Sequence, residues 1–289
     1  MKGKIVLITG ADSGIGKETA RNLAKMGASL VLVCRDRGKG ESAKEEIARA
    51  SNRTSTELLL ADLLSQNEVK RVVAEFKAVH ARLDVLVNNA GASFMDYGET
   101  EDGIERTMAI NYFTPFLLTN LLVDTLKNSV PSRVVNVSST EHYDAHFDIN
   151  NINKDSRMGT LGSEAYRRSK LAVILFTYEL ARRLQETGVT TNCLHPGAVR
   201  TNIWSHSGAL TPLFRFMSLF MQSPEKGAQT SVYLASSPEV ERVSGKYFDK
   251  KVPKRSSETS YDEALAKRLW ELSERMTGLV TANPAARGS

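Results

Sequence analysis

A tyrosine and a lysine four positions apart are the first residues of this sequence that could exchange a proton with a substrate. Tyr166 and Lys170 fall within a segment of helical spacing over 163–186, so both side chains lie on one face of the predicted helix. A free tyrosine has a pKa of about 10, and a nearby ammonium lowers that pKa by favouring the phenolate. Such pairs also arise by chance on many helices, so the position of this helix in the fold decides what the pair means.

A glycine-rich turn near the N-terminus could bind phosphate. Gly10, Gly14 and Gly16 follow a strand-like run over 4–9 and lead into a segment with helical spacing over 14–26. Glycine allows a tight turn and a close approach of the backbone to a ligand, and a helix N-terminus presents free N–H groups to an anion. Loops use glycine for several reasons, but a turn placed directly after the first strand indicates a pyrophosphate site.

Strand-like and helical segments alternate along the chain. The strand-like segments are 4–9, 29–34, 56–60, 83–89, 133–138, 189–194 and 246–248, and the helical ones are 14–26, 39–50, 68–80, 101–128, 163–186 and 224–236. This alternation predicts an α/β fold, a doubly wound parallel sheet with helices on both faces. No linker divides it, so we expect one domain over 1–277, and we expect a flexible tail over 278–289.

The composition excludes several classes of protein. The chain has 289 residues and a net charge of +5, but its Lys and Arg are spread among nearly as many acids, so we expect no nucleic-acid partner. The two cysteines, Cys34 and Cys193, lie in apolar runs and are predicted to be reduced core thiols, not metal ligands. No window is apolar over the ~18 residues that a membrane-spanning helix needs. We therefore expect a soluble, cytoplasmic protein without a membrane span.

Taken together, these motifs resemble the short-chain dehydrogenase/reductase family. The resemblance runs in order over about residues 4–250 and includes the turn TGxxxGIG, Asp62, Asn88-Asn89-Ala90-Gly91, Asn111, Ser139, Tyr166-x-x-x-Lys170 and Pro196-Gly197. It implies hydride transfer between a nicotinamide cofactor and a carbonyl or alcohol. The catalytic residues that it implies are Asn111, Ser139, Tyr166 and Lys170, with Ser138 as the alternative to Ser139. A serine after a strand is also a common turn residue.

The same resemblance implies which residues bind the cofactor. They come from the glycine turn, from the ends of the following strands, from the catalytic helix and from the segment after the sixth strand: Gly10, Ser13, Gly14, Ile15, Gly16, Arg35, Asp62, Leu63, Asn89, Ala90, Gly91, Tyr166, Lys170, Pro196, Gly197, Val199 and Thr201. Asn88 would line the ribose side with Ala90 and Gly91. We assign no role to His195, because a lone histidine there is more often structural.

The end of the second strand distinguishes NAD from NADP. An acid there would bond the ribose 2′-hydroxyl, and a base would accept a 2′-phosphate. Asp36 stands at the spacing that suits NAD, but Arg35 follows the strand directly, and Arg37 and Lys39 add positive charge. A guanidinium makes paired hydrogen bonds to phosphate. We therefore predict NADP(H), with Arg35 as the main contact, while Arg37 and Lys39 could equally belong to a solvated loop.

Within the family, the segments CRD, KGE, HPGAVRTNI and GAQTSVYLA most resemble the retinol dehydrogenase branch. This implies a hydrophobic aldehyde or ketone and its alcohol as substrates. The apolar segment 205–222 would cover the substrate; a surface helix packed on the core and a weak membrane contact are the alternatives. The family also implies a homodimer or homotetramer, formed through the helices near 111–128 and 163–186.

Two other functions remain compatible with this fold. The first is reduction of another carbonyl, such as a steroid, quinone or xenobiotic, which nothing in the sequence excludes. The second is a non-catalytic nucleotide-sensing module. Such a module would be expected to lose the tyrosine or the lysine, and both are present here.

Overall fold

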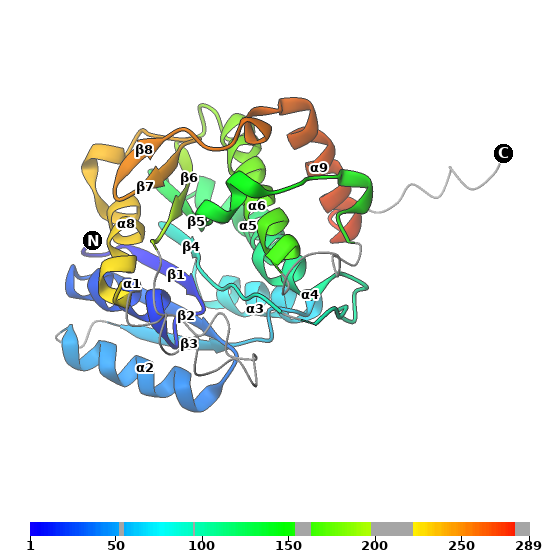
Figure 1. Cartoon of the computed structure of the whole chain (residues 1–289). Helices are drawn as coiled ribbons and strands as arrows, with labels where there is room; N and C mark the ends of the chain where they lie inside the picture. The colour runs from blue at the N-terminus through cyan, green and yellow to red at the C-terminus, as the bar shows by residue number, and fades with distance from the viewer. Residues whose placement is uncertain (52–54, 95, 154–162, 198–221, 281–289) are drawn as a thin grey trace.

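The chain folds around one sheet, described here from a computed structural model that covers residues 1–51, 55–94, 96–153, 163–197 and 222–280 (Figure 1). In this described part the sheet has eight strands in the order β3-β2-β1-β4-β5-β6-β7-β8. Neighbouring strands from β3 to β7 are parallel, and β8 is antiparallel to β7. The strands are β1 (Ile5–Thr9), β2 (Ser29–Cys34), β3 (Thr56–Leu60), β4 (Val85–Asn88), β5 (Ser132–Val137), β6 (Val189–His195), β7 (Tyr247–Asp249) and β8 (Val252–Lys254).

Helices cover both faces of the sheet, which confirms the predicted doubly wound fold. One face carries α1 (Gly14–Lys25), α2 (Arg37–Ala50) and α8 (Pro224–Ser236). The other carries α3 (Gln66–Val79), α5 (Thr114–Lys127), α6 (Ser163–Arg183) and α9 (Glu263–Met276). Shorter helical turns are α4 (Arg106–Met108), η1 (Ala109–Phe113), η2 (Thr140–Asp144), η3 (Ile149–Asn151), η8 (Pro238–Val240) and η9 (Glu258–Tyr261).

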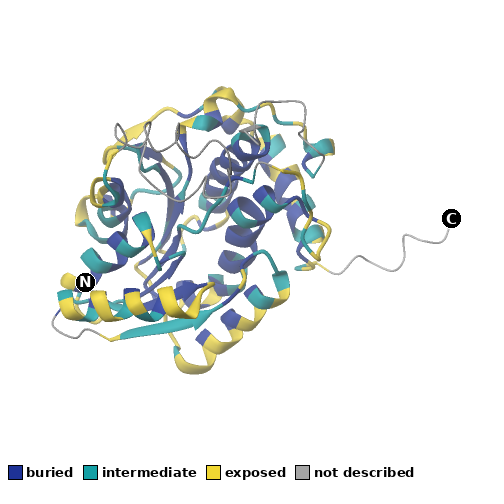
Figure 2. Cartoon of the chain, turned by 60° about the horizontal axis from the view of Figure 1, so that its bottom comes forward, coloured by how far each residue is buried: buried dark blue, intermediate teal, exposed yellow. Residues whose placement is uncertain are grey.

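The core follows from the alternation of side chains along the strands. Leu7 points to the α3–α5–α6 side, whereas Val6 and Ile8 point to the α1–α8 side, and none of the three is exposed. Figure 2 shows buried residues on the sheet and on the helix surfaces that face it. Burial of one large aliphatic side chain stabilises a fold by roughly 1.5–3 kcal/mol. Both cysteines are free and buried in this core, as predicted.

The structure differs from the predicted elements in three places. The helical segment expected over 101–128 begins at Arg106 and is interrupted by the π-helical turn η1. The edge strand β8 was not predicted, and neither was α9. The sequence does carry a signal for α9: Asp262 caps its N-terminus by accepting a hydrogen bond from Leu265 N, and Ala266, Leu269, Trp270 and Ser273 repeat with helical spacing on its buried side.

Helix α9 covers the helices that were expected to form a subunit interface. The ring centroid of Trp270 lies 5.0 Å from that of Phe116 on α5 and 5.8 Å from that of Phe176 on α6. Residues 171–180 of α6 are all buried within this single chain. The number of subunits stays a prediction. Within the described ranges, no helix combines the length and the apolar character needed to cross a membrane.

Candidate active site

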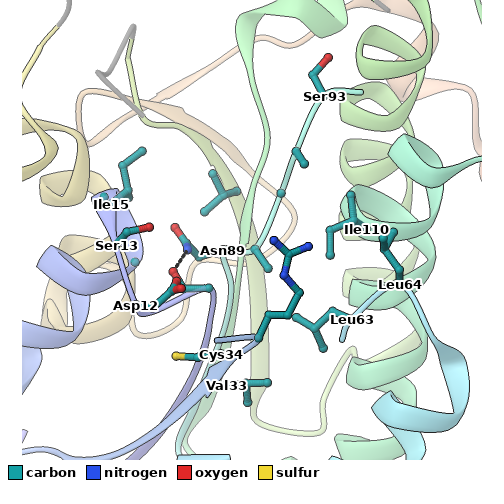
Figure 3. A pocket seen from close by; sticks show the side chains of 18 of the residues that line it. Asp12, Ser13, Ile15, Val33, Cys34, Leu63, Leu64, Asn89, Ser93 and Ile110 are labelled. Atoms are coloured by element: carbon teal, nitrogen blue, oxygen red, sulfur yellow. Dashed lines mark hydrogen bonds between the residues drawn. The ribbon is translucent and has the colours of Figure 1, made fainter. Parts of the chain in front are cut away.

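A pocket of about 490 Å³ lies at the carboxyl ends of the parallel strands (Figure 3). Its lining includes residues at or just after the ends of successive strands: Gly10, Cys34, Asp62, Asn89, Val137 and Pro196. In open α/β sheets, ligands bind in the crevice outside these strand ends, where the strand order reverses. Here the order reverses between β1 and β4, and Asn89 follows β4 directly. The position of the pocket is therefore the one that this fold uses for a dinucleotide.

The glycine turn packs against the end of β4. A Cβ atom on Gly16 would lie 2.1 Å from the Gly10 carbonyl oxygen and 2.4 Å from Asn89 Nδ2, so only glycine fits there. Asn89 Nδ2 donates to the carbonyl oxygens of Thr9 (2.9 Å) and Gly10 (3.1 Å) and fixes the turn. Ser13 lies in extended conformation before α1 and makes no capping hydrogen bond, and the first turn of α1 carries no acid. The N-terminus of α1 therefore suits a pyrophosphate.

Cations line the far end of the pocket. Arg35 and Lys39 both belong to its lining, and both are exposed. Asp36, the alternative NAD contact, is not part of that lining; its carboxylate caps α2 by accepting a hydrogen bond from Lys39 N at 2.8 Å. Arg37 also lies outside the lining. The structure thus separates Lys39, which faces the pocket, from Arg37, which does not.

The opposite end of the pocket brings together the predicted proton-transfer residues. Lys170 Nζ lies 5.3 Å from the centroid of the Tyr166 ring and donates to the Val137 carbonyl oxygen at 3.1 Å. Burial raises the pKa of Tyr166 to about 12, although the hydrogen bond between Ser139 and Tyr166 lowers this pKa in part. Burial also lowers the pKa of Lys170 to about 8. The prediction of a lowered tyrosine pKa is therefore wrong for the protein groups alone, because burial of the phenol outweighs its hydrogen bond with Ser139.

Two serines follow β5, and the structure separates their roles. Ser139 interacts with Tyr166, while Ser138 Oγ donates to the Lys170 carbonyl oxygen at 2.8 Å and holds α6 against the end of β5. Ser138 lines the pocket with its neighbour Val137. The geometry favours Ser139 over Ser138 as the serine that acts with the tyrosine.

Asn111 lies in the π-helical turn η1, where the regular helical hydrogen bonding is altered. Its Oδ1 accepts from Ala92 N at 3.0 Å, and its Nδ2 donates to the Ala92 carbonyl oxygen at 2.8 Å and to Ser169 Oγ at 3.0 Å. A Cβ on Gly91 would lie 2.7 Å from Asn111 Oδ1 and 3.5 Å from Lys170 Nζ. Asn111 therefore connects the segment after β4 to helix α6 by hydrogen bonds, next to Lys170.

Most residues predicted to bind the cofactor line this pocket: Gly10, Ser13, Gly14, Ile15, Gly16, Arg35, Asp62, Leu63, Asn89, Ala90, Gly91, Tyr166, Lys170 and Pro196. Gly197 is not part of the lining, and Val199, Thr201 and the predicted cover over 205–221 lie outside the described residues. Asn88 was expected on the ribose side, but its amide donates to Thr119 Oγ1 and Asn136 Oδ1 in the core.

The sequence did not reveal part of the lining. Leu64, Ala92, Ser93, Phe94 and Ile110 also line the pocket, and Figure 3 shows Leu63, Leu64 and Ile110 together on the side opposite Ser13 and Ile15. These residues lie after strand ends or on η1, where no motif marks them. Among the described residues, no group of three or more His, Cys, Asp or Glu side chains could hold a metal ion.

Comparison with known proteins agrees with this geometry. The model of the short chain dehydrogenase family matches residues 4–209, and the chain belongs to that family. Its members are oxidoreductases that use nicotinamide cofactors. A solved structure of an uncharacterized protein from Mycobacterium paratuberculosis has a TM-score of 0.75 and 32% identity, and the match covers 96% of this chain and 94% of that one.

Within the family, the chain is similar to retinol dehydrogenases. It is 45% identical over 297 residues to human retinol dehydrogenase 14, across 97% of this chain and 88% of that protein. It is 42% identical over 283 residues to human retinol dehydrogenase 13, across 96% of this chain and 85% of that protein. The resemblance to this branch, first indicated by short segments, is confirmed over nearly the whole chain.

Proposed function

We propose that this protein is an NADP(H)-dependent oxidoreductase that interconverts a hydrophobic aldehyde or ketone and its alcohol. The observation that carries the proposal is the meeting of Tyr166 and Lys170 at one end of a pocket whose other end has a glycine turn and two cations, with Ser139 hydrogen-bonded to Tyr166. The relatives named retinol dehydrogenases support a hydrophobic substrate of this class.

Three observations support NADP over NAD. Arg35 and Lys39 line the pocket, so both could bind a 2′-phosphate. Asp36, the residue that could have bonded a 2′-hydroxyl, is engaged at the N-terminus of α2. A Pseudomonas aeruginosa structure with 26% identity and a TM-score of 0.68 is an active-site complex with NADP.

The protonation of the catalytic side chains suits carbonyl reduction at neutral pH. A bound nicotinamide cofactor supplies the hydride. Because burial raises the pKa of Tyr166 to about 12, the phenol holds its proton and can donate it to the carbonyl oxygen as negative charge develops there. Ser139 hydrogen-bonds that oxygen. Lys170, with a pKa of about 8, is mostly an ammonium at pH 7 and stabilises the phenolate left behind.

Apolar side chains in the pocket lining support the proposed substrate class. Phe94, which follows β4, belongs to that lining, and apolar side chains are typical of sites for hydrophobic ligands. We propose that the segment 205–222 completes this surface. A steroid, quinone or xenobiotic ketone fits the same description and remains the alternative substrate.

A coenzyme and substrate panel tests the proposal. The purified protein should reduce long-chain polyene or aliphatic aldehydes with NADPH, with a kcat/KM about tenfold or more above that with NADH. Turnover of steroid or quinone ketones in preference to aldehydes would move the substrate assignment to the alternative. Binding of NADPH without turnover of any carbonyl would overturn the proposal and indicate a nucleotide-sensing module.

A further inference from the structure

A buried histidine, His142, hydrogen-bonds the main chain of Ser139, the residue that interacts with Tyr166. His142 is fully buried, and its Nδ1 lies 2.5 Å from the Ser139 carbonyl oxygen. His142 N also donates to that oxygen, at 3.4 Å. His142 belongs to the turn η2, and Ser139 is the N-terminal cap of that turn. The carbonyl of Ser139 is thus held by the main chain and by the imidazole of one residue.

A second histidine holds the next residue of the same segment. His195, at the end of β6, accepts a hydrogen bond from Thr140 N through its Nδ1 at 3.3 Å. Pro196, the next residue along the chain, lines the pocket. The carbonyl of Ser139 and the N–H of Thr140 belong to the same peptide group, so two histidines from separate elements hold its two polar atoms.

The two hydrogen bonds require opposite ring tautomers. A carbonyl oxygen can only accept, so His142 carries its proton on Nδ1; a peptide N–H can only donate, so His195 presents a bare Nδ1. We propose that His142 and His195 form a histidine clamp that positions the Ser139 hydroxyl toward Tyr166. The two histidines are positioning residues, and the inference rests on the proposed role of Ser139 in carbonyl reduction.

Packing alone does not explain an imidazole at position 142. The ring contacts Tyr143 and Tyr247, with centroids 4.0 Å and 4.8 Å away, and an apolar ring would make the same contacts. Its Nε2 is buried without a hydrogen-bond partner in the described part of the chain. Burial of an unpaired polar atom is unfavourable, so an imidazole is a poor choice for filling space. The hydrogen bond from Nδ1 to Ser139 is what an apolar side chain would lose.

Displacement of this peptide would reach the tyrosine through Ser139. The hydroxyl of Ser139 also accepts from Glu141 N at 3.3 Å, so its direction depends on the path of the backbone through η2. The hydrogen bond between Ser139 and Tyr166 lowers the pKa of the tyrosine. If the clamp opens, that hydrogen bond lengthens and the pKa of Tyr166 rises. The clamp therefore predicts a kinetic signature and not only a change in stability.

Two variants of similar shape test the inference. His142→Asn keeps an N–H donor near the position of Nδ1, whereas His142→Leu places a methyl group there. We expect His142→Leu to lower kcat about tenfold and to shift the pH profile of kcat in the same direction as Ser139→Ala, with an unchanged KM for NADPH. His142→Asn should restore most of the rate. Tyr247→Phe, which removes a neighbouring hydroxyl that has no partner among the described residues, is the control and should leave kcat unchanged.

Equal rates and pH profiles for His142→Asn and His142→Leu would overturn the clamp at that position. At position 195, Asn offers an acceptor oxygen and Leu does not, so the same comparison tests the second half. A measurement that needs no turnover separates this inference from the proposed function. The ¹⁵N shifts of the histidine rings in the wild-type protein should show the proton of His142 on Nδ1 and that of His195 on Nε2. The reverse tautomers would refute the clamp even if carbonyl reduction is observed, and the expected tautomers would support it even if no carbonyl is turned over.

Discussion

The two ends of the pocket are built in different ways. The end near α1, the main-chain end, consists of a glycine turn and a helix N-terminus, to which the exposed side chains of Arg35 and Lys39 add positive charge. The end near α6 depends on buried side chains: Lys170 lines it, and Ser139 and Asn111 lie behind it, all three at most 8% exposed. The first end can bind an anion through groups that any sequence with glycine at these positions presents. The second end depends on the identity and protonation of individual residues.

This difference teaches where substitutions should affect chemistry and where they should affect binding. At the main-chain end, a new Cβ or a lost charge should change coenzyme affinity and leave the chemical step intact. At the side-chain end, a lost hydroxyl should remove the chemical step and leave coenzyme affinity intact. The following experiments would contradict this distinction if substitutions at the main-chain end lowered kcat, or if substitutions at the side-chain end weakened coenzyme binding.

Tyr166→Phe should have the largest effect. Loss of a positioned general acid lowers kcat by about 10²–10⁴-fold, and the buried ring keeps its packing. The coenzyme dissociation constant, measured by fluorescence titration, should stay within about threefold of wild type. Tyr143→Phe is the matched control, because that hydroxyl bonds only the Arg255 carbonyl oxygen among the described contacts. A Tyr166→Phe enzyme with native kcat would show that another group delivers the proton.

Gly16→Ala should have the next largest effect, on binding. The added methyl group would meet the Gly10 carbonyl oxygen at 2.1 Å, so the turn or α1 must move. Overpacking of this kind costs about 1–3 kcal/mol, which corresponds to roughly 5- to 150-fold weaker coenzyme binding if the bound state bears the cost. Gly38→Ala is the control, since its Cβ would meet only Asp36 Oδ1 at 3.4 Å. Loss of kcat with native coenzyme affinity would contradict the assignment of this end.

Arg35→Ala should weaken NADPH binding about tenfold and leave NADH binding nearly unchanged. The guanidinium is exposed, so solvent and salt screen its attraction to a 2′-phosphate and limit the effect. Arg37→Ala, a neighbouring exposed arginine outside the pocket lining, should change neither coenzyme. Steady-state KM values for both coenzymes provide the measurement. An equal rise in KM for NADH and NADPH would mean that Arg35 does not bind the 2′-phosphate.

The same contrast explains what the sequence could predict. The glycine turn, the strand ends and the pair Tyr166 and Lys170 depend on spacing within single elements, and the structure brings them to one pocket. The central strands β1, β2 and β4 were found because parallel strands buried on both faces are continuous apolar runs. The fold class follows from their alternation with helices.

What the sequence could not predict depends on contacts between distant segments. The pKa of Tyr166 is set by its burial in the folded chain, which no local pattern reports. Asn88 and Asn89 are neighbours of the same type, yet one bonds Asn136 in the core and the other bonds the glycine turn. The role of His195 appears only when β6 lies beside η2, because its partner, Thr140, is far away in sequence.

The smallest effect should come from pH. Burial lowers the pKa of Lys170 to about 8, so the lysine is an ammonium below that pH and loses its charge above it. A neutral lysine no longer stabilises the phenolate that forms as Tyr166 gives up its proton. We therefore expect kcat for carbonyl reduction to be level from about pH 6.5 to 7, to halve near pH 8 and to fall further at higher pH. Lys170→Arg keeps its charge through this range and should lose this alkaline descent at a lower overall rate. A wild-type profile that stays level to pH 9 would show that the charge of Lys170 does not support the chemical step, and the side-chain end would then depend on Tyr166 and Ser139 alone.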